Sequence, residues 1–320
     1  MLWIPLTATA LGIAAIVLAL SILTYRMTFY NKHKEDFDPY HSVSKDPPPP
    51  FADVSRGLID RLIAEPCEEV SITAHDGAVL SGRYYHTRDG APIDLMLHGY
   101  KSGALHDFPG GALAALALGH NVLLVDQRGH GGSGGRSIAF GIRERFDCVD
   151  WVKYAIERFG EDVAITLVGI SMGAATVILA SELELPSAVR GIIADCPYSS
   201  AELMIRKTAA ELGFPEKLVF PFIRLGGRLF GGFDICERTP LEAARCAKLP
   251  LLLIHGTDDD FVPCDMSREI AAAYGGECRL ELFEGARHGT SYLVDTPRYL
   301  ALLSDFYEKI IDKEEINNDE

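Results

Sequence analysis

Short apolar segments alternate with segments of helical periodicity along most of this chain, and that alternation limits its fold more than any other feature. Short buried strands separated by helices favour βαβ units and predict an α/β fold. The alternation also predicts a mostly parallel sheet with helices on both faces. The predicted strands are 79–86, 93–97, 121–125, 163–168, 191–194, 249–254 and 279–283, and the predicted helices are 113–118, 146–158, 174–181, 266–274 and 298–311.

Composition and charge exclude several classes of protein. The 320 residues are 48% apolar and 23% charged, which is ordinary for a globular chain and excludes disorder or a small disulfide scaffold. The net charge of −15 repels phosphate backbones, so we expect no nucleic-acid partner. The seven cysteines form no C-x-x-C pair, so the sequence predicts no metal site and fits a reducing compartment.

The N-terminal segment carries no charged side chain before Arg26, and its apolar run from Leu2 to Tyr25 is long enough to cross a bilayer. We therefore predict a transmembrane anchor over residues 1–25. A cleaved signal peptide and a buried core helix are the alternatives. No basic residue precedes the run and the cleavage context is poor, which argues against a signal peptide. The run also lacks the polar face that a core helix normally shows.

The charges that flank this segment predict its orientation in the membrane. Basic residues lie only on its C-terminal side, at Arg26, Lys32 and Lys34. The positive-inside rule then predicts a single-pass membrane protein with its main domain in the cytoplasm. Residues 26–67 are predicted to be a juxtamembrane linker, stiffened by the prolines at 47–50. Residues 313–320 form a polar tail.

One motif after a predicted strand carries chemistry. Gly169, Ser171 and Gly173 form a G-x-S-x-G pattern between the strand 163–168 and the helix 174–181. The glycines permit a sharp strand-to-helix turn that holds the serine, strained, at the edge of the sheet. The alternative is an ordinary helix start with Ser171 as its N-cap.

Four further segments, in order, complete a resemblance to the α/β hydrolases over about residues 68–312. In that family they are an H-G oxyanion loop, a D-x-R-G-H-G-x-S loop, an H-G-x-x-D-x-x-V-P segment and a histidine loop. Here these segments are 98–100, 126–133, 255–263 and 285–289. The resemblance implies the α/β-hydrolase fold, with a mostly parallel, twisted sheet of about eight strands and a helical cap inserted at 197–248.

The resemblance also implies the roles of three side chains. Ser171 would be the nucleophile, His288 the general base and Asp259 the acid that orients the histidine. Register alone selects Asp259, because Asp258 and Asp260 flank it. Asp195, after another predicted strand, is an outside candidate for the acid; the alternative is a turn residue that binds local backbone.

The oxyanion donors implied by the family are backbone N–H groups, here those of Tyr100 and Met172. No cofactor is implied. The histidines of the two H-G turns, His98 and His255, are expected to bind backbone groups instead of taking part in the chemistry. Cys196 is expected to be structural.

These features predict a serine hydrolase that cleaves a small-molecule carboxylic ester or thioester through an acyl-enzyme. A peptidase, amidase or acyltransferase on the same residues is the first alternative, and a non-catalytic scaffold or binding protein is the second. Five phenylalanines in the cap either cover an apolar acyl or aryl group or form the small core of the cap itself. They are Phe214, Phe220, Phe222, Phe230 and Phe233.

Overall fold

The computed structural model describes residues 3–32, 38–40 and 51–311, and these contain an eight-stranded sheet of order β1-β2-β4-β3-β5-β6-β7-β8. β2 runs antiparallel to both of its neighbours, and every other neighbouring pair is parallel, so the predicted mostly parallel sheet is confirmed. The strands are β1 Glu68–Thr73, β2 Val79–Tyr85, β3 Ile93–Leu97, β4 Asn121–Val125, β5 Ile165–Ile170, β6 Val189–Asp195, β7 Leu251–Gly256 and β8 Cys278–Phe283.

The central strands are apolar on both faces, which explains their continuous apolar sequences. In β3, Leu95 and Leu97 pack into one core layer, while Met96 between them packs into the other. Helices cover both layers, as predicted. One face carries α5 (Glu144–Phe159), α6 (Met172–Ala180), α9 (Pro240–Cys246) and α10 (Asp265–Ala273); the other carries α2 (Phe51–Ala64), α3 (Ala104–Asp107), α4 (Pro109–Ala117) and α12 (Thr296–Ile311).

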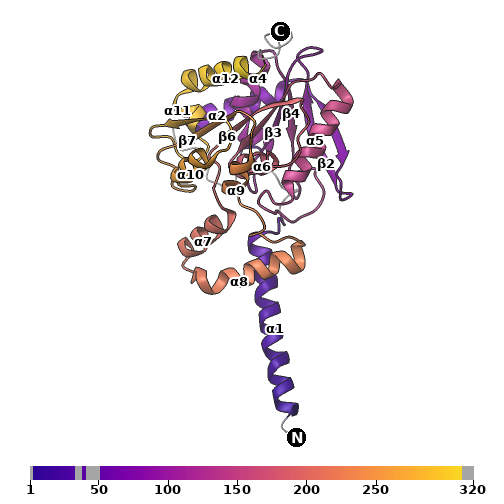
Figure 1. Ribbon diagram of the computed structural model, residues 1–320, viewed down its shortest axis with the longest axis vertical. Coiled ribbons are helices and arrows are strands. Elements are labelled where there is room, and N and C mark those ends of the chain that lie inside the picture. The colour runs from indigo at the N-terminus through magenta and orange to yellow at the C-terminus, as the bar shows by residue number, and fades with distance from the viewer. Residues whose placement is uncertain (1–2, 33–37, 41–50, 312–320) are drawn as a thin grey trace.

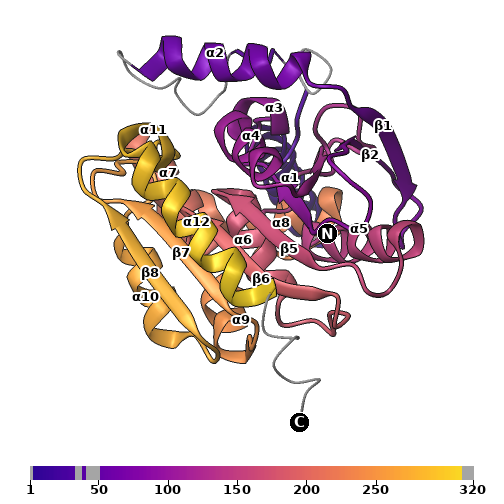
Figure 2. The ribbon, with the colours of Figure 1, turned by 90° about the horizontal axis from the view of Figure 1, so that it is seen from above.

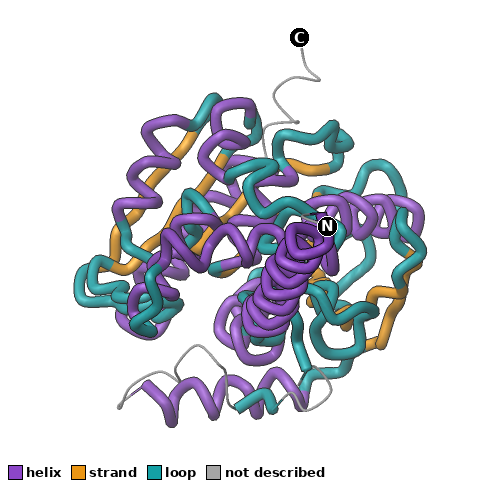
Figure 3. Tube along the Cα trace, turned by 90° about the horizontal axis from the view of Figure 1, so that it is seen from below, coloured by secondary structure: helices purple, strands orange, loops and turns teal. Residues whose placement is uncertain are grey.

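The helix α1 (Trp3–Thr28) projects from the rest of the molecule (Figure 1). Residues 7–28 are long and apolar enough to cross a membrane, with a mean hydropathy of 2.1 and 6% of the tested window buried. Figure 3 views this helix from its free end. Its C-terminal end differs from a free anchor, because Ser21, Tyr25 and Phe29 are buried.

Part of the expected linker 26–67 is instead a helix, α2 (Phe51–Ala64). Ile59 and Leu62 are buried on its inner side, and the helix runs along the outside of α3 and α4 (Figure 2). The prolines at 47–50 and the polar tail 313–320 lie outside the described residues.

The insertion between β6 and β7 divides into two parts. α7 (Ala201–Glu211), α8 (Glu216–Gly226) and the π-helical turn η2 (Gly227–Gly231) stand outside the sheet layers, where α1 emerges (Figure 1). α9 instead joins the core through Ala243 and Ala244. The part that covers the sheet edge is therefore shorter than the expected 197–248 and ends before Pro240. We call α7, α8 and η2 the cap.

Candidate active site

Ser171 lies in a strained turn between β5 and α6. Its backbone has φ 54° and ψ −114°, a conformation that residues other than glycine rarely adopt. The two glycines of the motif are needed for close approach. A Cβ on Gly169 would lie 2.3 Å from the carbonyl oxygen of Gly173, and one on Gly173 would lie 1.8 Å from that of Leu97. The turn therefore holds the serine at the carboxyl end of β5.

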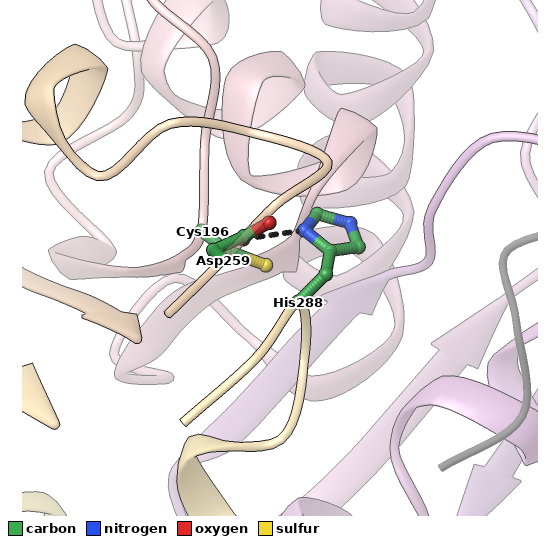
Figure 4. Close-up of side chains that lie close together, drawn as sticks. All are labelled: Cys196, Asp259 and His288. Carbon is green, nitrogen blue, oxygen red and sulfur yellow. Dashed lines mark hydrogen bonds and ion pairs between the residues drawn. The ribbon is translucent and has the colours of Figure 1, made fainter. Parts of the chain in front are cut away.

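Ser171, His288 and Asp259 form a continuous chain of hydrogen bonds. The Oγ of Ser171 lies 2.9 Å from Nε2 of His288, and Nδ1 of His288 lies 2.7 Å from Oδ2 of Asp259. Figure 4 shows the second contact, with the carboxylate beside the ring. An ionised carboxylate can only accept, so Nδ1 carries the proton and Nε2 is left to accept from the serine hydroxyl. The imidazole thus has the tautomer that a base for Ser171 requires.

The loop after β7 fixes the carboxylate of Asp259. Its Oδ1 accepts from the backbone N–H groups of Phe261 and Val262 at 3.0 and 2.8 Å. Burial alone would raise the pKa of Asp259, but hydrogen bonds from His255 and His288 hold that pKa well below its usual range. The group therefore stays ionised beside the imidazole.

The neighbouring carboxylates lie elsewhere. Asp258 is exposed and accepts from the hydroxyl of Thr257, while Asp260 is exposed and pairs with Arg287 at 2.6 Å. Asp195 lies beneath the site, where its Oδ2 accepts from the hydroxyl of Tyr299 at 3.1 Å. Its Oδ1 has no hydrogen-bond partner among the described residues, and burial raises its pKa to about 6. Of the four candidate acids, the structure brings Asp259 to His288.

Two buried histidines hold the loop after β3 beside Ser171. His130 accepts the backbone N–H of Lys101 on Nε2 at 2.9 Å, and burial holds its pKa well below the usual range, so it stays neutral and able to accept. His98 accepts the N–H of Gln127 at 3.0 Å, which matches its expected role in binding backbone. For His130 the sequence indicated no role; the only signal was its place in the D-x-R-G-H-G-x-S segment.

The two expected oxyanion donors border the serine on both sides. Met172 is the first residue of α6, where backbone N–H groups have no partner within the helix. The loop carrying Tyr100 approaches so closely that a Cβ on Gly99 would lie 3.4 Å from the Cβ of Ser171. Both segments therefore lie beside Ser171, and the binding of an oxyanion by their N–H groups stays a prediction.

Backbone strain is concentrated at this site. The described residues other than glycine with positive φ are Lys101, Phe140, Ser171 and Cys196. Lys101 follows Tyr100, the ring of Phe140 stacks on that of Tyr100 at 4.8 Å, and Cys196 lies beside Asp259 (Figure 4). Such conformations cost about 1–3 kcal/mol each and persist where the surrounding structure enforces them, often at functional sites.

Two groups of side chains have the spacing of metal ligands among the described residues: Cys196 with Asp259 and His288, and His75 with Asp147 and Asp150. In the first group, Nδ1 of His288 and Oδ2 of Asp259 bind each other. In the second, Asp147 is paired with Arg128 and Asp150 with His75. The carboxylates and histidines of both groups are thus engaged in hydrogen bonds or ion pairs with protein side chains.

The C-terminal end of α1 reaches this site, which the sequence did not indicate. The hydroxyl of Tyr100 donates to the carbonyl of Thr28 at 2.6 Å, and Nζ of Lys101 donates to that of Met27 at 3.3 Å. The last carbonyls of a helix lack partners within it, so the loop after β3 caps α1. Phe29 is fully buried, with its ring edge-on to Phe140.

With its sheet order, its elbow after β5 and a serine, histidine and aspartate joined at the strand ends, the chain has the α/β-hydrolase fold. A family model described as the alpha/beta hydrolase fold matches residues 95–233. Among solved structures, the Pyrococcus furiosus esterase Pf2001 is 25% identical with a TM-score of 0.65, covering 78% of this chain and 94% of that one.

Two curated relatives are similar to this chain in sequence. The uncharacterized protein YqkD of Bacillus subtilis is 29% identical over 62% of this chain and 66% of its own length. The human protein ABHD12B is 28% identical over 69% of this chain and 62% of its own length. The chain thus spans just under two thirds of each of these two relatives. The fold and the esterase neighbours support hydrolase activity on a small-molecule substrate.

Proposed function

We propose that this protein is a membrane-anchored serine hydrolase that cleaves a carboxylic ester or thioester through an acyl-enzyme intermediate. One observation carries the proposal: the hydrogen-bond chain from Ser171 through His288 to Asp259, with contacts of 2.9 and 2.7 Å. A serine hydroxyl is a poor nucleophile unless a base accepts its proton. In these hydrogen bonds the imidazole of His288 is that base, in the required tautomer.

The reaction runs in two halves. In the first, Oγ of Ser171 attacks the acyl carbon, its proton moves to Nε2 of His288, and Asp259 stabilises the imidazolium. The N–H groups of Met172 and Tyr100 stabilise the oxyanion, and His288 then protonates the departing alcohol or thiol. In the second, His288 activates a water molecule that attacks the acyl-serine and releases the acid.

The esterase named among the structural neighbours favours an ester over an amide, because that neighbour shares 25% of its aligned residues with this chain. A peptidase, amidase or acyltransferase would use the same side chains and differ in the leaving group or the acceptor. A non-catalytic scaffold has no need for a polarised Ser171 held at φ 54°.

Reaction with a fluorophosphonate probe tests the proposal. The purified full chain is expected to be labelled at Ser171, and to hydrolyse p-nitrophenyl esters faster than aminoacyl anilides of similar size. Faster cleavage of anilides would favour the peptidase. Hydrolysis slower than transfer to an added alcohol would favour the acyltransferase. A chain that is neither labelled nor active on any ester would refute the serine hydrolase.

The packing of α1 supports a retained membrane anchor and argues against a cleaved signal peptide. Ser21, Tyr25 and Phe29 are buried against the folded domain, and Asn31 donates to the carbonyl of Gly129 at 3.0 Å. Cleavage near residue 25 would remove part of this packing. With basic residues only after the span, we propose that the hydrolase domain lies in the cytoplasm.

The anchor and its orientation predict the behaviour of a reporter fused after Glu320. Expressed in a bacterium, a fluorescent fusion is expected to remain in the membrane fraction and to fluoresce, while an alkaline phosphatase fusion at the same position stays inactive. N-terminal sequencing of the membrane-bound protein should give a start before Leu11. Strong phosphatase activity would reverse the orientation, and a start beyond Tyr25 would make the segment a signal peptide.

A further inference from the structure

The cap presents an apolar face to the outside, which is unusual for a helix on the surface of a folded domain. In α8, Leu218, Pro221, Phe222 and Leu225 follow the spacing i, i+3, i+4 and i+7 of one helix face. Leu218 is 69% exposed, Pro221 is exposed, and Phe222 and Leu225 are half-buried. Three exposed apolar side chains flank the helix, namely Leu212, Phe214 and Leu229.

The opposite face of α8 packs against the rest of the protein. Phe220 and Ile223 are buried in the cluster that also contains Met172, Phe140 and Phe29. Of the five cap phenylalanines, Phe220 and Phe233 are buried, Phe214 and Phe230 are exposed, and Phe222 is half-buried. The exposed apolar face is therefore additional to the small core of the cap.

α8 is fixed against the candidate membrane span. It crosses α1 near the point where α1 leaves the domain (Figure 1). The contact is close, because a Cβ on Gly226 would lie 2.5 Å from the carbonyl oxygen of Ser21 and 2.9 Å from the Cβ of Tyr25. α8 thus cannot move along α1 without breaking this contact.

This contact sets the depth of α8 in a bilayer. The span 7–28 has 22 residues, or about 33 Å at 1.5 Å per residue, against a hydrocarbon core of about 30 Å. Ser21 and Tyr25 lie about 10 and 5 Å before its last residue, and Arg26 lies between Tyr25 and that end. α8 therefore lies within about 10 Å of the boundary between hydrocarbon and headgroups, on the hydrocarbon side. Beside it, α1 exposes Ile22, Leu23 and Met27.

We propose that the outward face of the cap, formed by Phe214, Leu218, Phe222, Leu225 and Leu229, lies in the interface of the bilayer that α1 spans. An amphipathic helix at this depth buries its apolar face among acyl chains, while long basic side chains reach the headgroups. Lys217 is exposed on the flank of α8, and Arg228, in η2, is exposed and pairs with Asp234. In this placement, the apolar face of α8 continues the lipid-facing surface of α1.

The same placement identifies the source of the substrate, and this step rests on the proposed function. The cap contacts the loop after β7 directly and the loop after β3 through α1. Lys207 of α7 donates to the carbonyl of Asp260 at 2.9 Å, and α8 packs with α1, which holds Tyr100. The ring of Phe261, 5.0 Å from that of His288, lies in the same cluster as Phe220. The substrate is thus an amphiphilic acyl ester taken from the adjoining leaflet.

A measurement of depth tests the membrane contact without using activity. Leu218→Trp and Leu118→Trp are prepared in the full chain and reconstituted into phosphatidylcholine nanodiscs, with and without brominated lipid. Leu118, 44% exposed at the end of α4 on the far side of the domain, is the matched control. Brominated lipid is expected to quench the tryptophan introduced at position 218 at least about threefold more than the tryptophan introduced at position 118. Equal quenching at both positions overturns the proposal.

A measurement of rate tests the source of the substrate. In Leu218→Gln/Leu225→Gln, hydrolysis of a fluorogenic long-chain ester embedded in nanodiscs is expected to fall about tenfold. Hydrolysis of dissolved p-nitrophenyl butyrate should stay within about twofold, and Leu118→Gln should change neither rate.

The outcomes separate the two proposals. Equal losses on both esters would mean that the face acts on the fold of the site and not on lipid access, which overturns the inference. Quenching at 218 in a protein inactive on every ester would keep the membrane contact and refute the hydrolase. Cross-linking between copies at position 218, without quenching by lipid, would assign the face to a protein partner and refute the lipid contact.

Discussion

Ser171→Ala is expected to lower kcat for p-nitrophenyl butyrate by at least about four powers of ten, as the loss of a nucleophile does in serine enzymes of this type. Alanine can adopt the φ of 54° about as well as serine, so the fold and the thermal midpoint should stay close to those of the wild type. Steady-state rates and circular dichroism of both proteins provide the measurement.

A serine elsewhere provides the control. Ser304 lies in α12, where its hydroxyl faces Glu308, and Ser304→Ala should keep the full rate. If purified Ser171→Ala retains a tenth of the wild-type rate, Ser171 is not the nucleophile, whatever its geometry.

Asp259→Asn is expected to lower kcat by about 10³–10⁴, because an amide can donate to Nδ1 and so favour the wrong tautomer of His288. The neighbouring aspartates are matched controls in the same loop. Asp258→Asn and Asp260→Asn should each stay within about tenfold, since both side chains are exposed and the ion pair of Asp260 with Arg287 is a surface contact. A severe loss at either neighbour, with Asp259→Asn active, would assign the acid to that neighbour.

The pH dependence adds a second check on Asp259. Its pKa is lowered in the folded protein, so its ionised form should persist down to and below the ordinary value of 3.8. The stability that it contributes is therefore present above about pH 4 and is lost only as the pH falls through the lowered pKa. Between pH 4 and 8, Asp259 should accordingly add no titration step of its own to the profile of kcat/KM against pH.

The sequence predicted the centre of the sheet well, for a physical reason. β3 and β4 occur at the predicted residues 93–97 and 121–125, because strands buried on both faces are continuously apolar. β1 (Glu68–Thr73) was not predicted. It is an edge strand, and most of its side chains are exposed. Exposed positions need not be apolar, so this strand lacks the apolar run by which the others were predicted.

The departures nearer the N-terminus have a different cause. α2 has the helical spacing of Ser55, Ile59 and Leu62, but the prolines before it made a linker the simpler prediction for 26–67.

The motif residues could be identified because each follows a strand, so the topology brings them to one edge of the sheet. The support of that edge by His130 and Thr28 depends on contacts between distant segments, which no local pattern records.

The capping of α1 by Tyr100 and Lys101 bears on how this protein should be prepared. A fragment trimmed to begin after Tyr30, a natural choice for avoiding detergent, would uncover Phe140 and Phe233 and leave the hydroxyl of Tyr100 without its acceptor. Kinetics measured on such a fragment would describe an enzyme with an altered wall beside its nucleophile. α1 is therefore part of the folding unit, and any comparison of variants belongs in a chain that retains it.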